Sequence, residues 1–136
     1  MWSFGWILYE LYTGYPLFAG EDETEQMQMI MEVKGIPPLT VIKQGNRWRT
    51  FFHSNYNPKL IPNSRNKTRI PDTKKLQDMI TTDDPYFVDF IDKWIEWRVE
   101  DRLNPRRALQ HNWIKAGLSE ISKGKAKGTK SVQKSN

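Results

Sequence analysis

The chain of 136 residues contains no cysteine and only two histidines, His53 and His111. The absence of cysteine excludes a disulfide framework, a thiolate metal site and a cysteine nucleophile, and it fits a reducing compartment. The two histidines do not stand at metal-ligand spacing. The most hydrophobic run carries Glu10 and ends after about a dozen residues, short of the roughly 20 that span a bilayer. We therefore expect a soluble protein of the cytoplasm, the nucleus or both.

Catalytic patterns are also lacking. The carboxylates between Asp83 and Asp101 are spaced like a solvated helix face rather than a general acid/base pair. Ser3 lies in no nucleophile elbow. Residues 124–131 have the glycines, lysines and hydroxyls of a phosphate-binding loop, but at the wrong spacing. The sequence thus predicts no catalytic, cofactor-binding or metal-ligating residue in this chain.

The positive charge is concentrated at the C-terminus. The net charge is +5, and five lysines with no acid follow Glu120. Without these lysines the body carries 16 basic and 16 acidic residues, so it is neutral. We interpret residues 116–136 as a disordered, solvated basic tail. Binding of this tail to nucleic acid or an acidic membrane is the weaker alternative, and we expect no specific nucleic acid and no membrane as partner.

The N-terminal segment predicts the central helix of the fold. Apolar side chains between Trp2 and Tyr12 point in every direction of a helical wheel, which is typical of a helix buried on all sides. Gly14 and Pro16 end it. Chain ends usually lie at the surface, so we expect a further segment before this helix, without which its apolar surface would be exposed.

The other segments also predict helices. Acids at 21–23 and Gly35 delimit a helix over about 22–34, and Asp83-Asp84-Pro85 starts one over about 85–97 that packs on the first. Asn104-Pro105 starts a short helix over about 105–110. Residues 39–82 have no lasting period, which predicts a long irregular insertion pinned by Trp48, Phe51 and Phe52, with a possible short helix near 75–80. The fold class is mainly α.

Two polar side chains near the C-terminus have open interpretations. His111 ends a short helix and is interpreted as a capping or packing residue rather than a ligand. Arg102 precedes a buried turn, where an arginine can hold a carboxylate in a planar, bidentate pair. An exposed arginine beside acids fits the spacing equally well.

The chain resembles one known family. Residues 2–11, Trp2-Ser3-Phe4-Gly5-Trp6-Ile7-Leu8-Tyr9-Glu10-Leu11, with Thr13-Gly14-Tyr15-Pro16, resemble the F-helix signature of eukaryotic protein kinases. Residues 25–37 look like the G helix of the CMGC group. Arg102-Leu103-Asn104-Pro105, with Ala108-Leu109, His111 and Trp113, is similar to the C-terminal motif of the kinase domain. Phe51-Phe52, Asn63-Ser64 and residues 67–76 look like the insertion of dual-specificity tyrosine-regulated (DYRK) kinases.

The resemblance implies the lower half of a kinase C-lobe over residues 1–115, with F, G, H and I helices. It implies seven structural scaffold residues: Trp2, Gly5, Glu10, Pro16, Trp94, Arg102 and Trp113. Arg102 matches the family arginine that pairs with the Glu of the A-P-E motif, which this chain lacks. Met1 stands where the family has an Asp, so the similarity begins inside a motif. Trp6 stands where a smaller residue is usual.

Two functions follow from the resemblance. In the first, the chain is the C-terminal fragment of a serine/threonine (dual-specificity) kinase whose full-length form uses ATP and magnesium to phosphorylate protein substrates. The glycine-rich loop, phosphate-binding lysine, catalytic-loop Asp and Asn, and D-F-G motif are all absent, so we expect this chain alone to be inactive. In the second, it is a truncated, non-catalytic relative that docks proteins through the helix at 22–34 and the insertion.

Overall fold

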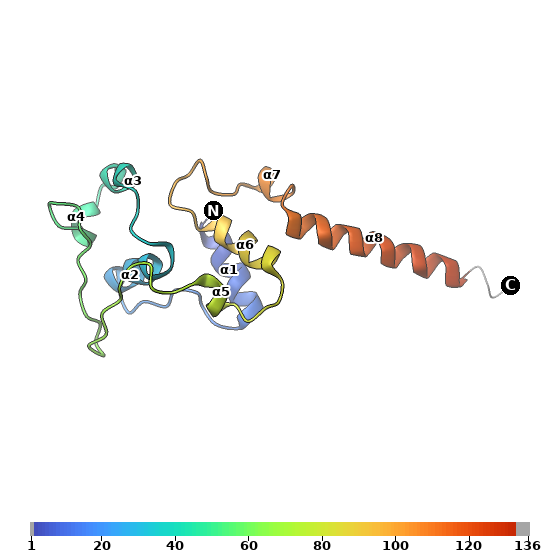
Figure 1. Cartoon of the computed structure of the whole chain (residues 1–136), viewed down its shortest axis with the longest axis horizontal. Coiled ribbons are helices and arrows are strands. Elements are labelled where there is room, and N and C mark those ends of the chain that lie inside the picture. The colour runs from blue at the N-terminus through green and yellow to red at the C-terminus, as the bar shows by residue number, and fades with distance from the viewer. Residues whose placement is uncertain (1, 133–136) are drawn as a thin grey trace. The chain divides into compact units, whose positions relative to one another are not determined.

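The computed structural model describes the backbone of residues 2–132 and the side chains of residues 2–124. Two compact units divide after Arg102. The first contains α1 (Trp2–Thr13), α2 (Glu23–Lys34), α3 (Leu39–Gln44), α4 (Trp48–Phe51), α5 (Leu76–Met79) and α6 (Pro85–Trp94). The second contains α7 (Pro105–Ala108) and α8 (Asn112–Val132) (Figure 1). Within residues 2–132 the only strand-like pairing is an isolated bridge between Phe52 and Pro58, so the mainly α prediction is confirmed.

The helix boundaries with strong cap signals lie where the sequence places them. The Asp22 side chain accepts a hydrogen bond from the Glu25 N–H at the start of α2, and Gly35 ends that helix at φ 70°. Glycine suits this left-handed conformation because it has no Cβ. The Asp84 side chain caps α6 by accepting from the N–H groups of Tyr86 and Phe87, and Pro85 occupies the first turn. Helix α6 ends at Trp94, three residues earlier than predicted.

Helices α1 and α6 pack at very close range, as predicted. A Cβ added at Gly5 would lie 2.8 Å from the Trp94 Cβ and 3.4 Å from the Ile91 carbonyl oxygen. Glycine at this position therefore allows the two backbones to approach. The Phe4 ring also meets the Trp94 ring edge-on, at 4.7 Å between centroids. Helix α5 packs beside α6 in the same unit.

In this chain α1 is not buried on every side, and part of its apolar surface is exposed, as we expected of the helix without a further segment over it. Gly5 and Tyr9 are buried, but Ile7 is 51% exposed and Leu11 is 77% exposed. Phe4 and Tyr12 are also exposed. The physical reason is that α6 and the end of α5 with the residues after it cover one side of α1, where Tyr9 and Tyr12 donate to the Met79 and Thr81 carbonyl oxygens. A helical wheel reports which faces are able to be buried, not which are covered.

The insertion contains more helix than predicted. Two short helices, α3 and α4, lie in the stretch that we expected to be irregular, and α5 falls within the predicted 75–80 window. The pinning prediction is confirmed, because buried Phe52 packs with Met31 of α2, and Trp48 and Phe51 lie against the same cluster. Val41 and Ile42 lie in α3, and Phe51 ends α4.

In the second unit the Asn104 side chain caps α7 by accepting from the Arg107 N–H. The His111 Nδ1 accepts from the Trp113 N–H at the start of α8, which fits the capping interpretation. The prediction of a disordered tail from residue 116 is wrong as far as Val132, because α8 continues to that residue. Its Ala, Leu, Glu and Lys residues have high helix propensity, and backbone hydrogen bonds within a helix are local. Residues 133–136 lie outside the described part.

Candidate functional site

Four of the seven scaffold residues meet at the junction between α1 and the end of α6. The Trp2 Nε1 donates to the Glu96 carbonyl oxygen at 3.1 Å, and its ring lies 5.1 Å from that of Trp97. Trp94 is buried beside Gly5. The Trp94 Nε1 has no hydrogen-bond acceptor among the described residues, so this indole contributes through packing. These contacts make the junction an aromatic scaffold rather than a chemical site.

The Arg102 side chain contacts the same junction. Its Nε donates to the Glu96 carbonyl oxygen at 3.0 Å, and its Nη2 donates to that of Trp97 at 3.3 Å. The guanidinium carbon lies 5.2 Å from the centre of the Trp2 ring. Burial lowers the pKa of Arg102, while the Glu96 carboxylate opposes that shift. Its role here is to satisfy carbonyl oxygens beyond the end of α6 and to stack on an aromatic ring.

The remaining scaffold residues are less enclosed. Glu10 and Pro16 are exposed, on α1 and on the turn after it. Trp113 belongs to the second unit, at the start of α8, where it is half-buried. Of the seven residues, the structure thus brings Trp2, Gly5, Trp94 and Arg102 into one junction.

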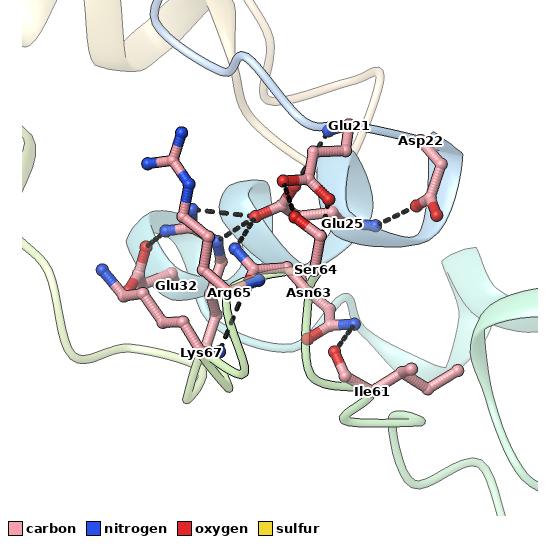
Figure 2. A network of polar contacts seen from close by, with 11 residues as sticks. Glu21, Asp22, Glu25, Glu32, Ile61, Asn63, Ser64, Arg65 and Lys67 are labelled. Atoms are coloured by element: carbon pink, nitrogen blue, oxygen red, sulfur yellow. Dashed lines mark hydrogen bonds and ion pairs between the residues drawn. The ribbon is translucent and has the colours of Figure 1, made fainter.

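A polar network that sequence reasoning missed connects the insertion to α2 (Figure 2). The Arg69 Nε and Nη2 donate to the Glu25 Oε1 at 3.2 and 3.0 Å, and its Nη1 donates to the Glu32 Oε2 at 3.0 Å. Asn63 Nδ2 donates to the same Glu25 oxygen at 2.8 Å. All three side chains of the ion pairs are about nine-tenths buried. We call Arg69, Asn63, Glu25 and Glu32 the α2 clamp.

The electrostatics of the clamp centre on Glu25. The pKa of Glu25 falls to about 2 because the Glu21 N–H donates to its carboxylate, with further donation from Asn63 and Arg69, against the opposing effect of burial. The Glu21 N–H lies 2.8 Å from the second carboxylate oxygen. Glu25 is therefore ionised at neutral pH and holds the insertion against the first turn of α2.

The insertion also completes the backbone hydrogen bonding of α2. The Asp72 N–H donates to the Met31 carbonyl oxygen, and the N–H groups of Thr73 and Lys74 both donate to that of Glu32, each at 3.0 Å. Gln28 Nε2 donates to the Ile61 carbonyl oxygen at 3.0 Å. The last carbonyls of a helix have no intrahelical partner, so the end of the insertion satisfies part of this requirement.

A second ionic contact connects α2 with α6. Lys34 Nζ lies 2.7 Å from the Asp92 Oδ1 and 3.1 Å from the Glu96 Oε1, and the Lys34 side chain is only 10% exposed. The Trp97 Nε1 donates to the carbonyl oxygens of Lys34 and Gly35. The end of α2 is therefore fixed to the segment after α6, and the Trp97 ring is held in place.

An apolar pocket of about 410 Å³ lies between these elements. Its lining combines Met27 of α2, residues of α3 and α4, and Trp97; the full set is Met27, Pro37, Val41, Ile42, Gly45, Asn46, Arg47, Trp48, Phe51, Phe52 and Trp97. A pocket of this size with few polar groups is a typical binding site for an apolar group. The signal in the sequence was the aromatic cluster at 48–52, which we interpreted only as an anchor.

Among the described residues there is neither a metal-binding cluster nor a membrane-spanning helix. Within the described part of the chain, no group of three or more His, Cys, Asp or Glu side chains is placed to hold a metal ion. In the same part of the chain, no helix has both the length and the apolar character needed to cross a membrane.

Comparison with known proteins places the chain. The model of the protein kinase domain family matches residues 1–114. Dual specificity tyrosine-phosphorylation-regulated kinase 4 of Homo sapiens is 49% identical over 114 residues, which cover 84% of this chain and 22% of that protein. Dual specificity tyrosine-phosphorylation-regulated kinase 2 of Drosophila melanogaster is 43% identical over 119 residues, which cover 88% of this chain and 16% of that protein. Serine/threonine-protein kinase ppk5 of Schizosaccharomyces pombe is 41% identical over 127 residues, covering 91% and 15%.

The chain spans less than a quarter of the length of each of these relatives. The fold of residues 2–132, helical and without a sheet, fits a segment of the kinase C-lobe. Protein kinases as a family generally use ATP and Mg²⁺ and act on proteins. The chain belongs to the protein kinase family, as part of a DYRK-like serine/threonine kinase domain of the CMGC group.

Proposed function

We propose that this chain is the C-terminal part of a dual-specificity protein kinase, whose full-length form transfers the γ-phosphoryl group of ATP to hydroxyl groups of protein substrates with the help of magnesium. The observation that carries the proposal is the family match over residues 1–114, together with identities of 41–49% to the kinases named above. We place the full-length kinase in the cytoplasm, the nucleus or both.

The contribution of this chain is support and docking, not chemistry. The motifs that phosphoryl transfer requires do not occur in its sequence. The junction of Trp2, Trp94 and Arg102 and the α2 clamp would hold the base of the kinase domain rigid. The exposed apolar side of α1, with Phe4, Ile7 and Leu11, supports a fold in which another segment of the kinase covers this helix.

The first experiment reads the coding sequence upstream of Met1. We expect an open frame that encodes the catalytic-loop H-R-D and the D-F-G motif. An in-frame stop codon directly before Met1 would contradict the proposal and favour a truncated, non-catalytic relative that docks proteins.

The second experiment measures phosphate transfer. The pure chain, with radiolabelled ATP, magnesium and a general protein substrate, should give no incorporation above a blank, whereas the protein expressed from the longer frame should phosphorylate the substrate. Transfer by the pure chain would refute the division of labour proposed here. Inactivity of the long protein would refute the enzyme function itself.

A further inference from the structure

The apolar pocket is built from elements that are already fixed in position. The Trp97 ring forms one wall and is held by donation from its Nε1 to the Lys34 and Gly35 carbonyl oxygens, at 3.3 and 3.2 Å. Phe52 is buried in the cluster beneath, with Ile42 and Met31. Such a preformed pocket binds a ligand without a large cost in ordering its own side chains.

The segment that carries α3 and α4 is fixed from both sides. Arg47 forms a two-point ion pair with Glu23 of α2, at 3.1 and 2.6 Å. The Lys59 N–H donates to the Phe51 carbonyl oxygen, and the His53 N–H donates to that of Asn57, both at 2.8 Å. These bonds, together with the α2 clamp, hold the pocket walls against α2.

The segment that supplies most of the pocket lining carries basic residues and no acid. Residues 35–71 contain seven basic residues and no Asp or Glu: Lys43, Arg47, Arg49, Lys59, Arg65, Lys67 and Arg69. Of these, Arg47 and Arg69 are paired with acids of α2. Lys43 and Arg49 are exposed next to the pocket, where Lys43 lies over the Tyr56 ring and Arg49 over the Trp48 ring. The rim therefore presents cationic heads on aromatic rings beside an apolar interior.

We propose that this pocket docks an acidic segment of a partner protein, in which a large apolar side chain enters the pocket and flanking Asp or Glu residues meet Lys43 and Arg49. An aromatic or leucine anchor supplies the apolar area that such a pocket excludes from water. The acidic flanks supply attraction and orientation through complementary charge. A basic or neutral segment would lose this complementarity.

The proposal does not depend on phosphoryl transfer, because no residue of the pocket takes part in that reaction. It is tested first by selection. The full chain of 136 residues, immobilised through its N-terminus, is used to select a displayed library of random dodecapeptides. We expect enriched peptides to combine an aromatic or leucine residue with several Asp or Glu residues. Enrichment of neutral or basic peptides, or none above an empty surface, would overturn the proposal.

Two variants and two matched controls locate the binding. Val41→Glu places an acid in the pocket wall, and Leu39→Glu places the same acid on the same helix at an exposed position outside the lining. The double change Lys43→Glu and Arg49→Glu reverses the rim charge, and Lys74→Glu with Lys75→Glu makes the same change of net charge elsewhere in the insertion. Fluorescence anisotropy of the best labelled peptide measures each Kd at low and high salt.

We expect Val41→Glu and the rim reversal each to weaken binding about tenfold or more, with both controls near the parent value. Rim reversal should also flatten the salt dependence of the Kd. A second measurement keeps the proposal testable if Val41→Glu does not fold. In NMR spectra of the unaltered chain, the peptide should shift the indole N–H resonances of Trp48 and Trp97, but not that of Trp94. Equal effects of variants and controls would contradict the proposal.

Self-association is the competing outcome. If sedimentation shows a dimer that Val41→Glu abolishes and Leu39→Glu does not, the pocket holds a second copy of this chain, and the proposal is wrong. Failure of peptide binding would leave phosphorylation by the longer protein unaffected, so the two proposals fail separately.

Discussion

Replacement of Glu25 by glutamine should destabilise the chain in a pH-dependent manner. Glu25 is 7% exposed and accepts hydrogen bonds from the Glu21 N–H, Asn63 and Arg69. Glutamine keeps the shape and one acceptor oxygen, but its NH₂ group replaces the second acceptor. One donor is then left unpaired in a buried place, and Arg69 loses the charge of its nearer partner.

The magnitude follows from the pKa of Glu25, which lies at about 2 instead of 4.5. By linkage this lowering corresponds to about 3 kcal/mol of stabilisation by the ionised carboxylate. Glutamine retains part of the hydrogen bonding, so we expect a loss of about 2 kcal/mol at pH 7. Because the folded pKa lies below the unfolded pKa, the stabilisation is complete above pH 4.5 and disappears as the pH falls toward 2.

The assay is urea unfolding followed by tryptophan fluorescence at pH 7, 5, 4 and 3 and constant salt, for the unaltered chain and for Glu25→Gln. The gap in unfolding free energy should be constant from pH 7 to 5 and narrow below that. Glu10→Gln is the control, because it makes the same chemical change at an exposed position of α1, outside the α2 clamp. A carboxyl-carbon NMR titration reads the Glu25 pKa directly. A value near 4.5, or an equal gap at all four pH values, would refute the reasoning.

Three further changes test other parts of the fold. Gly5→Leu should lower the unfolding free energy by about 3 kcal/mol, because its side chain would meet Trp94 and the α6 backbone, and urea titration against Ser3→Ala checks this. Asp84→Ala should cost about 1 kcal/mol by removing the acceptor for the Tyr86 and Phe87 N–H groups, and an unchanged midpoint would count against the cap. Gly117→Ala should increase far-UV helicity by stabilising α8 by about 1 kcal/mol, since nothing lies within 4 Å of the added Cβ, and unchanged ellipticity would argue against that helix.

The parts of the fold that the sequence predicted are those with local causes. Asp22, Gly35, Asp84 and Asn104 each act on backbone groups within a few residues, so cap chemistry alone located the ends of α2 and the starts of α6 and α7. The packing of α1 on α6 was also predictable, because both helices have large apolar faces.

The parts that could not be predicted depend on contacts between distant residues. Helix α3 has six residues and α4 has four, too few to show a period, and they are held by packing on Met31 and by Glu23. The α2 clamp joins Arg69 to residues 44 and 37 positions away. Its only local signal was the spacing of Glu25 and Glu32, two helical turns apart on one face of α2.

The donation from residues 72–74 to the α2 carbonyl oxygens has a consequence for how the molecule opens. This loop provides the last hydrogen bonds of α2, and its Arg69 also binds Glu25 in the first turn of the same helix. It therefore cannot fluctuate freely over the helix surface. Amide exchange at Asp72 and Thr73 should therefore follow the slow exchange of α2 rather than the fast exchange of a surface loop. In kinetic terms, α2 and the distal part of the insertion form one cooperative unit, which opens and closes as a whole.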